Sequence, residues 1–222
     1  MHSLSPEKSS MPVAKNENNM VWVRHKNGES RMRLNRRDLL LGASAAGASC
    51  ALPGTAFAKK ASRIDTLKPI INPELRMWNA NTNERLSSVF WRDGNFDVQE
   101  LRRIDWFMRD WRQAEVKPCS RDLLWSLAAI SEAAIRDGHS GEIRFLSGYR
   151  SRKTNNYLRE IGRNAARNSL HIEAKAVDFS FPGIPVEPIF KYAKWLEVGG
   201  CGHYPGSFVH MDTGIVREWI GS

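Results

Sequence analysis

The spacing of the apolar residues changes near the middle of this chain. Between residues 97 and 137 they recur every three or four positions, which is the period of an amphipathic helix. From residue 142 to residue 212 most segments alternate between apolar and polar residues or form short apolar runs bounded by glycine and proline, which is typical of β-strands. Both patterns in this order favour the α+β class, and we predict a small antiparallel sheet with flanking helices.

Turn and capping residues give the bounds of the predicted elements. A hairpin is predicted first, with extended runs at 75–79 and 85–91 on either side of an Asn-Thr-Asn turn. Asp97 can cap a helix that extends to about Gln113, and Ser120 can cap a second helix that ends near Asp137. The later predicted elements are strands at 142–147, 175–181, 199–204 and 208–212, and helices at 154–161 and 186–196.

The first 58 residues contain a different kind of signal. The run Asn-Arg-Arg-Asp-Leu-Leu at 35–40 resembles the twin-arginine export motif. The apolar stretch from Leu39 to Leu52 is too short to span a bilayer well, and Ala-Phe-Ala at 56–58 matches the small-x-small pattern of a signal cleavage site. An apolar anchor helix is the alternative interpretation.

These features predict three regions. Residues 1–58 are expected to be an N-terminal extension with a twin-arginine-type signal peptide, residues 59–73 a polar linker, and residues 74–222 the folded domain. The protein is then expected in the periplasm, with no stable membrane insertion after the signal is cleaved.

Composition excludes some classes of partner. The chain has 33 Lys and Arg against 24 Asp and Glu, but residues 1–58 contain eight of the basic and four of the acidic residues. The remaining 25 and 20 leave a net charge of about +5, which favours anionic surfaces only weakly. No aromatic ladder or finger spacing argues for nucleic acid, and we predict no such partner; protein partners are not indicated.

Cys119 and Cys201 do not make a disulfide framework, although a pairing between them stays open, as does a metal-ligand role for Cys201.

Three side chains that can bind a metal lie in the last third of the sequence. His171 precedes a predicted strand that contains Asp178, and His210 lies on a later strand between two apolar neighbours. A carboxylate in an apolar strand is costly unless it is paired or bound to a metal. Two imidazoles and one carboxylate suit zinc, with a fourth position left to water in hydrolases. If the strands pair, the three can share one face, and strand geometry puts Asp212 there as well. Taken singly, each of these residues is more often structural.

Several short motifs follow one another in a recognisable order. They are Ser-Gly-Tyr-Arg-Ser at 147–151, Thr-Asn at 154–155, Ser-Leu-His at 169–171, Ala-Val-Asp-Phe at 176–179, Gly-Gly-Cys-Gly at 199–202, Tyr-Pro at 204–205, and Phe-Val-His-Met-Asp-Thr-Gly at 208–214, with Arg217 and Trp219 after them. Together they resemble the M15-type zinc peptidases, and among these the murein endopeptidase K-like family, once a domain of unknown function. The likeness extends over about residues 75–219, and it implies the M15/hedgehog-like zinc peptidase fold.

The resemblance also implies roles for individual residues. His171, Asp178 and His210 would hold one zinc ion. Arg150, in the Ser-Gly-Tyr-Arg turn, would stabilise an oxyanion or hold a substrate carboxylate, and a structural salt bridge is its alternative role.

The sequence departs from the family pattern at three positions. Ala174 stands where the family commonly has glycine, and His203 stands where tyrosine is more common. Some M15 relatives have a glutamate base three residues before the last ligand, and this chain has Ser207 there. Asp212 is therefore the first candidate for the general base and His203 the second. Asp212 could instead orient a ligand histidine.

The activity implied by the resemblance is zinc-dependent hydrolysis of the peptide cross-links between peptidoglycan stem peptides. Whether a DD or an LD bond is cut is left open. Two alternatives also stay open: a zinc carboxypeptidase or dipeptidase acting on D-Ala ends, and a non-catalytic cell-wall-binding domain of the same fold. A closed pocket ending at Arg150 would favour the first alternative, and zinc binding without hydrolysis would favour the second.

Overall fold

The computed structural model describes residues 21–24, 30–33, 62–163 and 165–221. The chain divides into two compact units, residues 1–55 and 56–222. The described part of the first unit is an antiparallel pair of strands, β1 (Val21–Arg24) and β2 (Ser30–Arg33). The export motif and the cleavage pattern lie outside the described residues, so the export signal stays a prediction. No helix in the described part of the chain combines the length and the apolar character needed to cross a bilayer.

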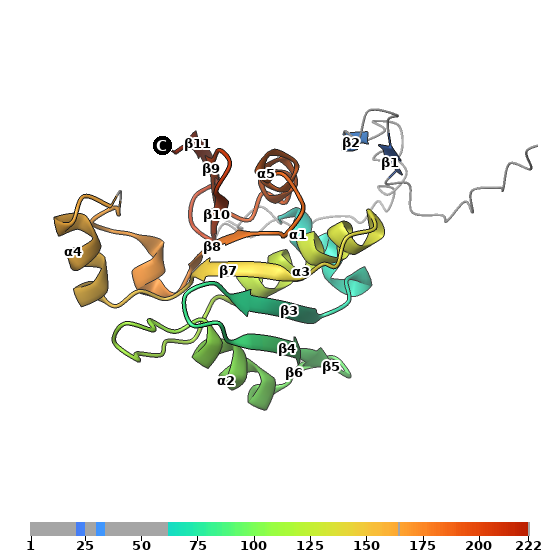
Figure 1. Ribbon diagram of the computed structural model, residues 1–222. Coiled ribbons are helices and arrows are strands. Elements are labelled where there is room, and N and C mark those ends of the chain that lie inside the picture. Colours follow the sequence, from blue (N-terminus) through green and yellow to red (C-terminus); the bar gives the residue numbers. More distant parts are fainter. Residues whose placement is uncertain (1–20, 25–29, 34–61, 164, 222) are drawn as a thin grey trace, which may run out of the picture. The chain divides into compact units, whose positions relative to one another are not determined.

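A seven-stranded sheet forms the centre of the second unit (Figure 1). Its strands, in spatial order, are β11 (Arg217–Ile220), β9 (Gly200–Tyr204), β10 (Phe208–Asp212), β8 (Ala176–Ser180), β7 (Ile143–Ser147), β3 (Glu74–Asn79) and β4 (Arg85–Val89). The helices are α1 (Arg63–Leu67), α2 (Val98–Phe107), α3 (Arg121–Arg136), α4 (Arg152–Glu160) and α5 (Val186–Trp195). Two 3₁₀ turns, η1 (Lys68–Ile70) and η2 (Leu170–Glu173), and a small hairpin of β5 (Trp91–Arg92) and β6 (Asn95–Phe96) complete the unit.

The predicted α+β class is confirmed, but the sheet is mixed rather than antiparallel. β3 pairs with β7 in parallel, and β11 pairs with β9 in parallel. Two helices, α2 and α3, lie between β4 and β7 in the sequence, and such a crossover lets β7 return parallel to β3. β11 is added at the outer edge of β9, a position that no local pattern indicates.

Most predicted elements lie within one or two residues of their predicted bounds, and two predictions need correction. α2 ends at Phe107 rather than near Gln113, because the buried carboxylate of Asp110 accepts hydrogen bonds from the backbone N–H groups of Arg112 and Ser151 and turns the chain. Residues 63–70, predicted as part of a linker, form α1 and η1, with Ile64 fully buried.

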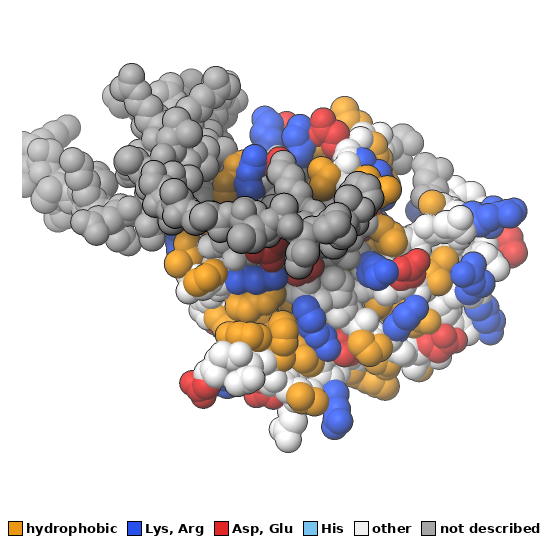
Figure 2. Space-filling model, turned by 180° about the vertical axis from the view of Figure 1, so that it is seen from behind, with side chains coloured by type: hydrophobic (Ala, Val, Ile, Leu, Met, Phe, Trp, Pro, Cys, Tyr) orange, Lys and Arg blue, Asp and Glu red, His pale blue; other side chains and the backbone are white. Residues whose placement is uncertain are grey.

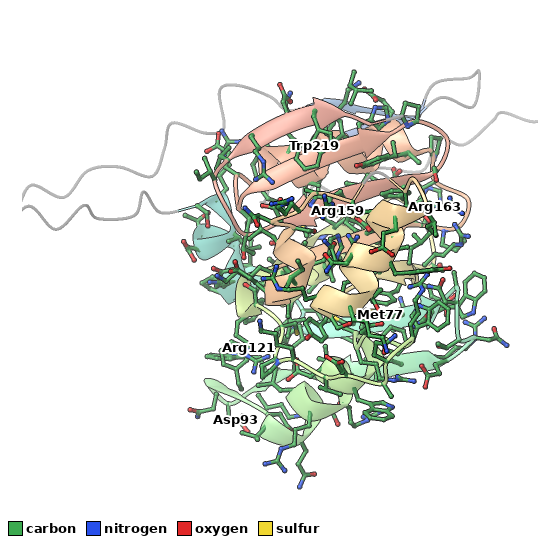
Figure 3. All side chains as sticks on the ribbon, turned by 90° about the vertical axis from the view of Figure 1, so that its left-hand side faces the viewer. Met77, Asp93, Arg121, Arg159, Arg163 and Trp219 are labelled. Atoms are coloured by element: carbon green, nitrogen blue, oxygen red, sulfur yellow. The ribbon has the colours of Figure 1, made fainter. Side chains whose placement is uncertain are left out.

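α3 and α5 pack against the sheet, whereas α4 stands apart from them at one end of it. Leu123, Leu124 and Leu127 of α3 are fully buried, as are Phe145 and Phe179 of the sheet. Figure 1 shows α4 beyond the ends of β7 and β8, and Figure 3 views the molecule from that side. The end of the sheet beside α4 is where the candidate site lies.

The two cysteines of the second unit are free and buried, which generates a first prediction. The Cys119 thiol donates to Asp105 Oδ1 at 3.0 Å, and burial holds its pKa well above the usual value. Burial, reinforced by Asp212 and Glu218, raises the pKa of Cys201 to about 12. At pH 8 the thiol of Cys201 is therefore almost entirely protonated. We expect iodoacetamide at this pH to label neither residue in the folded protein and both in guanidinium chloride, as checked by peptide mass mapping. A disulfide, or rapid labelling of either residue in the folded state, would contradict this.

Candidate metal centre

The pairing of β8 with β10 places Asp178 beside His210. The register of these antiparallel strands sets the two residues directly opposite each other. Val177 and Phe179, on either side of Asp178, are fully buried, and the alternation of a strand turns them toward the opposite face of the sheet. Asp178 and His210 are thus brought together by the main-chain ladder itself.

His171 reaches the same place from η2, just before β8. Ser169 caps this turn by accepting a hydrogen bond from the backbone N–H of His171. The turn closes at Ala174, whose φ of 53° lies in the left-handed region that favours glycine. This explains why glycine suits the position, and here Ala174 adopts the left-handed conformation in its place.

The donor atoms of His171, Asp178 and His210 lie close together. His171 Nε2 is 3.3 Å from Asp178 Oδ1 and 3.3 Å from His210 Nδ1, and His210 Nδ1 is 2.8 Å from Asp178 Oδ1. Ligand atoms bonded to one tetrahedral zinc ion at about 2.0–2.1 Å lie about 3.3 Å apart. The cluster therefore has the donor set and the spacing to hold one metal ion.

Each imidazole is held through the nitrogen that faces away from the cluster. His171 Nδ1 lies 2.6 Å from the carbonyl oxygen of Gly148, which can only accept, so Nδ1 carries the hydrogen and Nε2 has a free lone pair. His210 Nε2 lies 3.2 Å from Asp212 Oδ2, which leaves Nδ1 toward the cluster. This arrangement of outer partners is usual for metal-binding histidines.

The protonation of the cluster follows from burial and neighbouring charge. Burial lowers the pKa of His171 to about 4 in spite of the nearby Asp178. Burial also opposes protonation of His210, but hydrogen bonds to Asp178 and Asp212 outweigh it and raise its pKa to about 9. Burial of Asp178 is likewise outweighed by the two histidines, which hold its pKa well below the usual value. The carboxylate is thus balanced by one imidazolium, a positive charge that a divalent cation can replace.

Asp212 shares the face of His210, as its position in β10 predicts, and both of its oxygens are engaged by protein groups. Its Oδ1 accepts from the backbone N–H groups of Gly200 and Gly214, both at 2.9 Å, and its Oδ2 accepts from Arg217 Nη2 at 2.7 Å. Burial would favour the neutral acid, but the hydrogen bonds from His210 and Arg217 hold the pKa of Asp212 far below its usual value. A carboxylate whose lone pairs are all engaged is poorly suited to take a proton.

Arg150 lies next to the cluster and His203 does not. Arg150 Nη2 is 3.7 Å from Asp178 Oδ2, and its buried Nε has no hydrogen-bond partner among the described residues. Burial lowers the pKa of this guanidinium below its usual value. His203 stacks on the Phe190 ring of α5 and lies 3.3 Å from Glu187, on the face of β9 opposite to the cluster. The structure thus contradicts the placing of His203 at the site.

The cluster opens into a groove of about 560 Å³. His171 is fully buried, whereas the side chains of Asp178 and His210 keep exposures of 15% and 12%. Leu158 and Arg163 line the groove on the side of α4, and Tyr204, Phe208 and Trp219 line it on the side of the last strands. The rings of Tyr204 and Phe208 stack with centroids 4.2 Å apart.

Two residues of the motif pattern, to which the sequence assigned no role, hold this second wall in place. The ring of Trp219 lies so close to Gly202 that a side chain there would meet it at 2.6 Å. Trp219 also lies against the imidazole of His210, with centroids 5.2 Å apart. The sequence did not explain why glycine and tryptophan occur at these two positions. The parallel pairing of β11 with β9 explains it, because it sets Trp219 beside Gly202.

Comparison with known proteins places the chain in a family. A family model described as "Peptidoglycan L,D-endopeptidase MepK", of the M15 peptidases, matches residues 71–219. The "Probable peptidoglycan L,D-endopeptidase MepK" of Haemophilus influenzae is 38% identical over 188 residues, 84% of this chain and 95% of the relative. The "Peptidoglycan L,D-endopeptidase MepK" of Escherichia coli K12 is 37% identical over 187 residues, 83% of this chain and 97% of the relative. No solved structure gives a significant match. The chain therefore belongs to the MepK family of M15-type peptidases, as the motifs predicted.

Proposed function

We propose that this protein is a metal-dependent endopeptidase that hydrolyses peptide cross-links of peptidoglycan. The observation that carries the proposal is the convergence of His171, Asp178 and His210, from separate segments, at a groove open to solvent. Family membership supports a peptidase. The printed names of the relatives support peptidoglycan as the substrate and an L,D bond as the bond that is cut, which the sequence alone left open.

Zinc is the proposed metal, held by His171, Asp178 and His210. Two nitrogen donors and one carboxylate oxygen are a donor set that zinc commonly takes in hydrolases. The chemistry supplied by such an ion is Lewis acidity, which polarises a carbonyl group and makes water acidic enough to act as a nucleophile near neutral pH. The protein supplies the fixed orientation of the donors and the groove in which the peptide lies.

We assign different tasks to Arg150 and Asp212. Arg150 is a cation beside the cluster with a buried donor to spare, which suits it to stabilise the negative charge that develops on the carbonyl oxygen. Asp212 orients His210 and raises its basicity rather than acting as the general base. In this proposal the general base is a group other than Asp212 and His203.

Export by the twin-arginine route to the periplasm is part of the proposal. It is supported by the run at 35–40 and the small-x-small pattern at 56–58, and by relatives whose names describe action on a wall polymer. In this scheme residues 1–58 are the export segment and residues 74–222 the catalytic domain.

The first test of the proposed function is digestion of cross-linked muropeptide dimers joined by an L,D bond. We expect monomers to appear with the metal-loaded protein and none to appear after treatment with a chelator, because the donor cluster has no catalytic group of its own to replace the ion. Products are identified by mass spectrometry, and activity should return when zinc is restored. Cleavage that is insensitive to the chelator would overturn the metal-dependent mechanism.

The ligand set is tested by His171→Ala and His210→Ala. Each change removes a donor from the cluster, and we expect zinc affinity to fall by more than about 100-fold and activity to be lost. The matched control is His139→Ala, which removes an imidazole beyond the end of α3 and should leave zinc content unchanged. Full zinc binding in either cluster variant would remove that residue from the ligand set.

Arg150 is tested by Arg150→Ala with Arg150→Lys as its companion. Because the guanidinium lies beside the cluster without being one of its donors, we expect the alanine variant to keep zinc and to lose kcat by about 10²–10³-fold. Lysine keeps the charge but not the planar fork, so it should restore turnover only in part. Normal kinetics in the alanine variant would give Arg150 a purely structural role.

A further inference from the structure

Cationic side chains gather on α4 and on the loop that follows it. Between residues 152 and 167 there are five basic side chains and a single acidic one, Glu160, whereas the whole of residues 59–222 has a net charge of only about +5. All five are exposed. They are Arg152, Lys153, Arg159, Arg163 and Arg167. Figure 2 shows Lys and Arg side chains concentrated at the edge of the molecule where α4 lies, and Figure 3 labels Arg159 and Arg163 on it.

These five side chains differ from most other cations of the protein in having no ion-pair partner among the described residues. Elsewhere the arginines are largely neutralised, as Arg63 is by Glu197, Arg109 by Glu84 and Arg217 by Asp212. Arg152 and Lys153 stand in the first turn of α4, where the positive end of the helix dipole repels cationic side chains. A binding partner that carries negative charge would relieve this repulsion.

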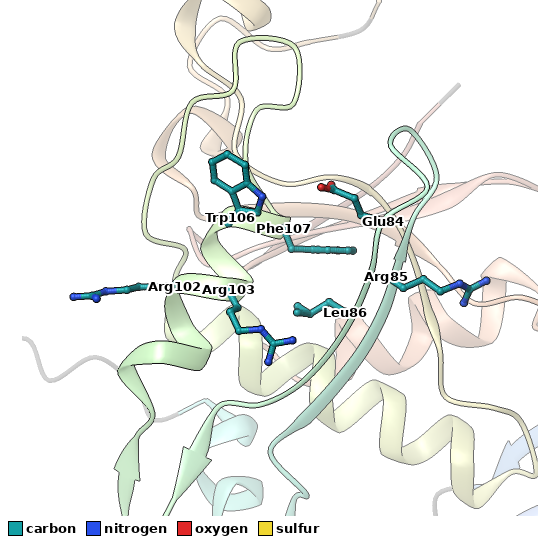
Figure 4. A pocket seen from close by; sticks show the side chains of 7 residues that line it. All are labelled: Glu84, Arg85, Leu86, Arg102, Arg103, Trp106 and Phe107. Atoms are coloured by element: carbon teal, nitrogen blue, oxygen red, sulfur yellow. The ribbon is translucent and has the colours of Figure 1, made fainter.

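A second hollow rich in arginine shows the contrast. It lies between β4 and α2 and is lined by Arg85, Arg102 and Arg103 among others (Figure 4). Arg85 pairs with Glu142 and Arg103 pairs with Glu100, while Arg102 points away from the hollow. This hollow is therefore close to neutral, and an accumulation of arginines does not by itself leave free positive charge on this protein.

The unpaired cations adjoin the groove of the metal cluster. Arg163 lines that groove together with His171 and Asp178. Arg152, Arg159 and Arg167 line a second hollow of about 590 Å³ beside α4, together with the acidic Glu160. The fully buried Asn155 of α4 donates from Nδ2 to the carbonyl oxygen of Ala166 at 3.0 Å, which ties Ala166 to the helix. The cationic side chains thus lie beside the site.

We propose that the arginines of α4 and its loop form a carboxylate-binding extension of the active-site groove. Its ligands are the free carboxylates of the stem peptides that flank the cross-link, so the inference rests on the proposed function and adds a determinant of substrate binding to it. Each guanidinium offers a planar fork that matches a carboxylate in two hydrogen bonds. A row of such groups beginning at the groove holds an acidic peptide along α4 while its backbone crosses the cluster.

The test compares the double variant Arg159→Gln/Arg163→Gln with the protein otherwise unchanged. The substrates are an L,D-cross-linked muropeptide dimer with free carboxylates and the same dimer with its carboxylates amidated. For the free dimer at low salt we expect KM to rise about tenfold, with kcat and zinc content unchanged and with the difference shrinking at high salt. For the amidated dimer the variant and the parent should have the same KM. Arg102→Gln/Arg144→Gln removes the same charge from residues that have no ion-pair partner in the described structure, and should leave KM unchanged.

Several outcomes would overturn the inference. An unchanged KM of the double variant would do so, as would an equal rise for both dimers. Loss of binding to phosphatidylglycerol vesicles with an unchanged KM would assign the arginines to a membrane surface instead. If the parent protein cuts neither dimer, the proposed function fails separately. Calorimetric titration of the free dimer then decides the inference, and equal Kd values for parent and variant would reject it.

Discussion

The architecture of this protein is governed by the need to keep Asp178 ionised inside a sheet. An isolated carboxylate among apolar strands would be expensive to bury, and the fold meets this cost by surrounding it with His171, His210 and Arg150. None of these three partners is a close neighbour of Asp178 in the sequence. They arrive from a 3₁₀ turn, from a neighbouring strand and from the turn after β7. The packing of the domain is therefore also the assembly of its site.

A second layer of contacts determines how the first layer is oriented. The Gly148 carbonyl oxygen fixes the tautomer of His171, and Asp212 does the same for His210. Asp212 is in turn held by Arg217 and by two backbone amides. Because each layer restricts the next, the donors are held close together in a set orientation. Such preorganisation lowers the cost of binding an ion or stabilising a developing charge.

Much of the fold could be predicted from the sequence because local rules decide it. The helix at 121–136, the hairpin of β3 and β4 and the strands around Asp178 and His210 follow from periodicity and turn residues. The parallel pairings and the position of β11 could not, since they depend on contacts between distant segments. Strand alternation placed Asp212 correctly. The sequence does not indicate on which face of the sheet the His203 side chain lies. Only the pairing of β9 with β10 shows that it faces α5. The cluster of basic residues on α4 and its loop was not predicted, because the net charge of the domain is an average over all of its residues.

The edge position of β11 has a further consequence for the robustness of the site. β11 carries both Arg217, which holds Asp212, and Trp219, which lies against His210. A chain shortened before this strand would retain all three donors but would lose the support of one of them. Damage at this outer margin of the sheet, such as proteolytic removal of β11, would therefore weaken the candidate site without touching any of its donors.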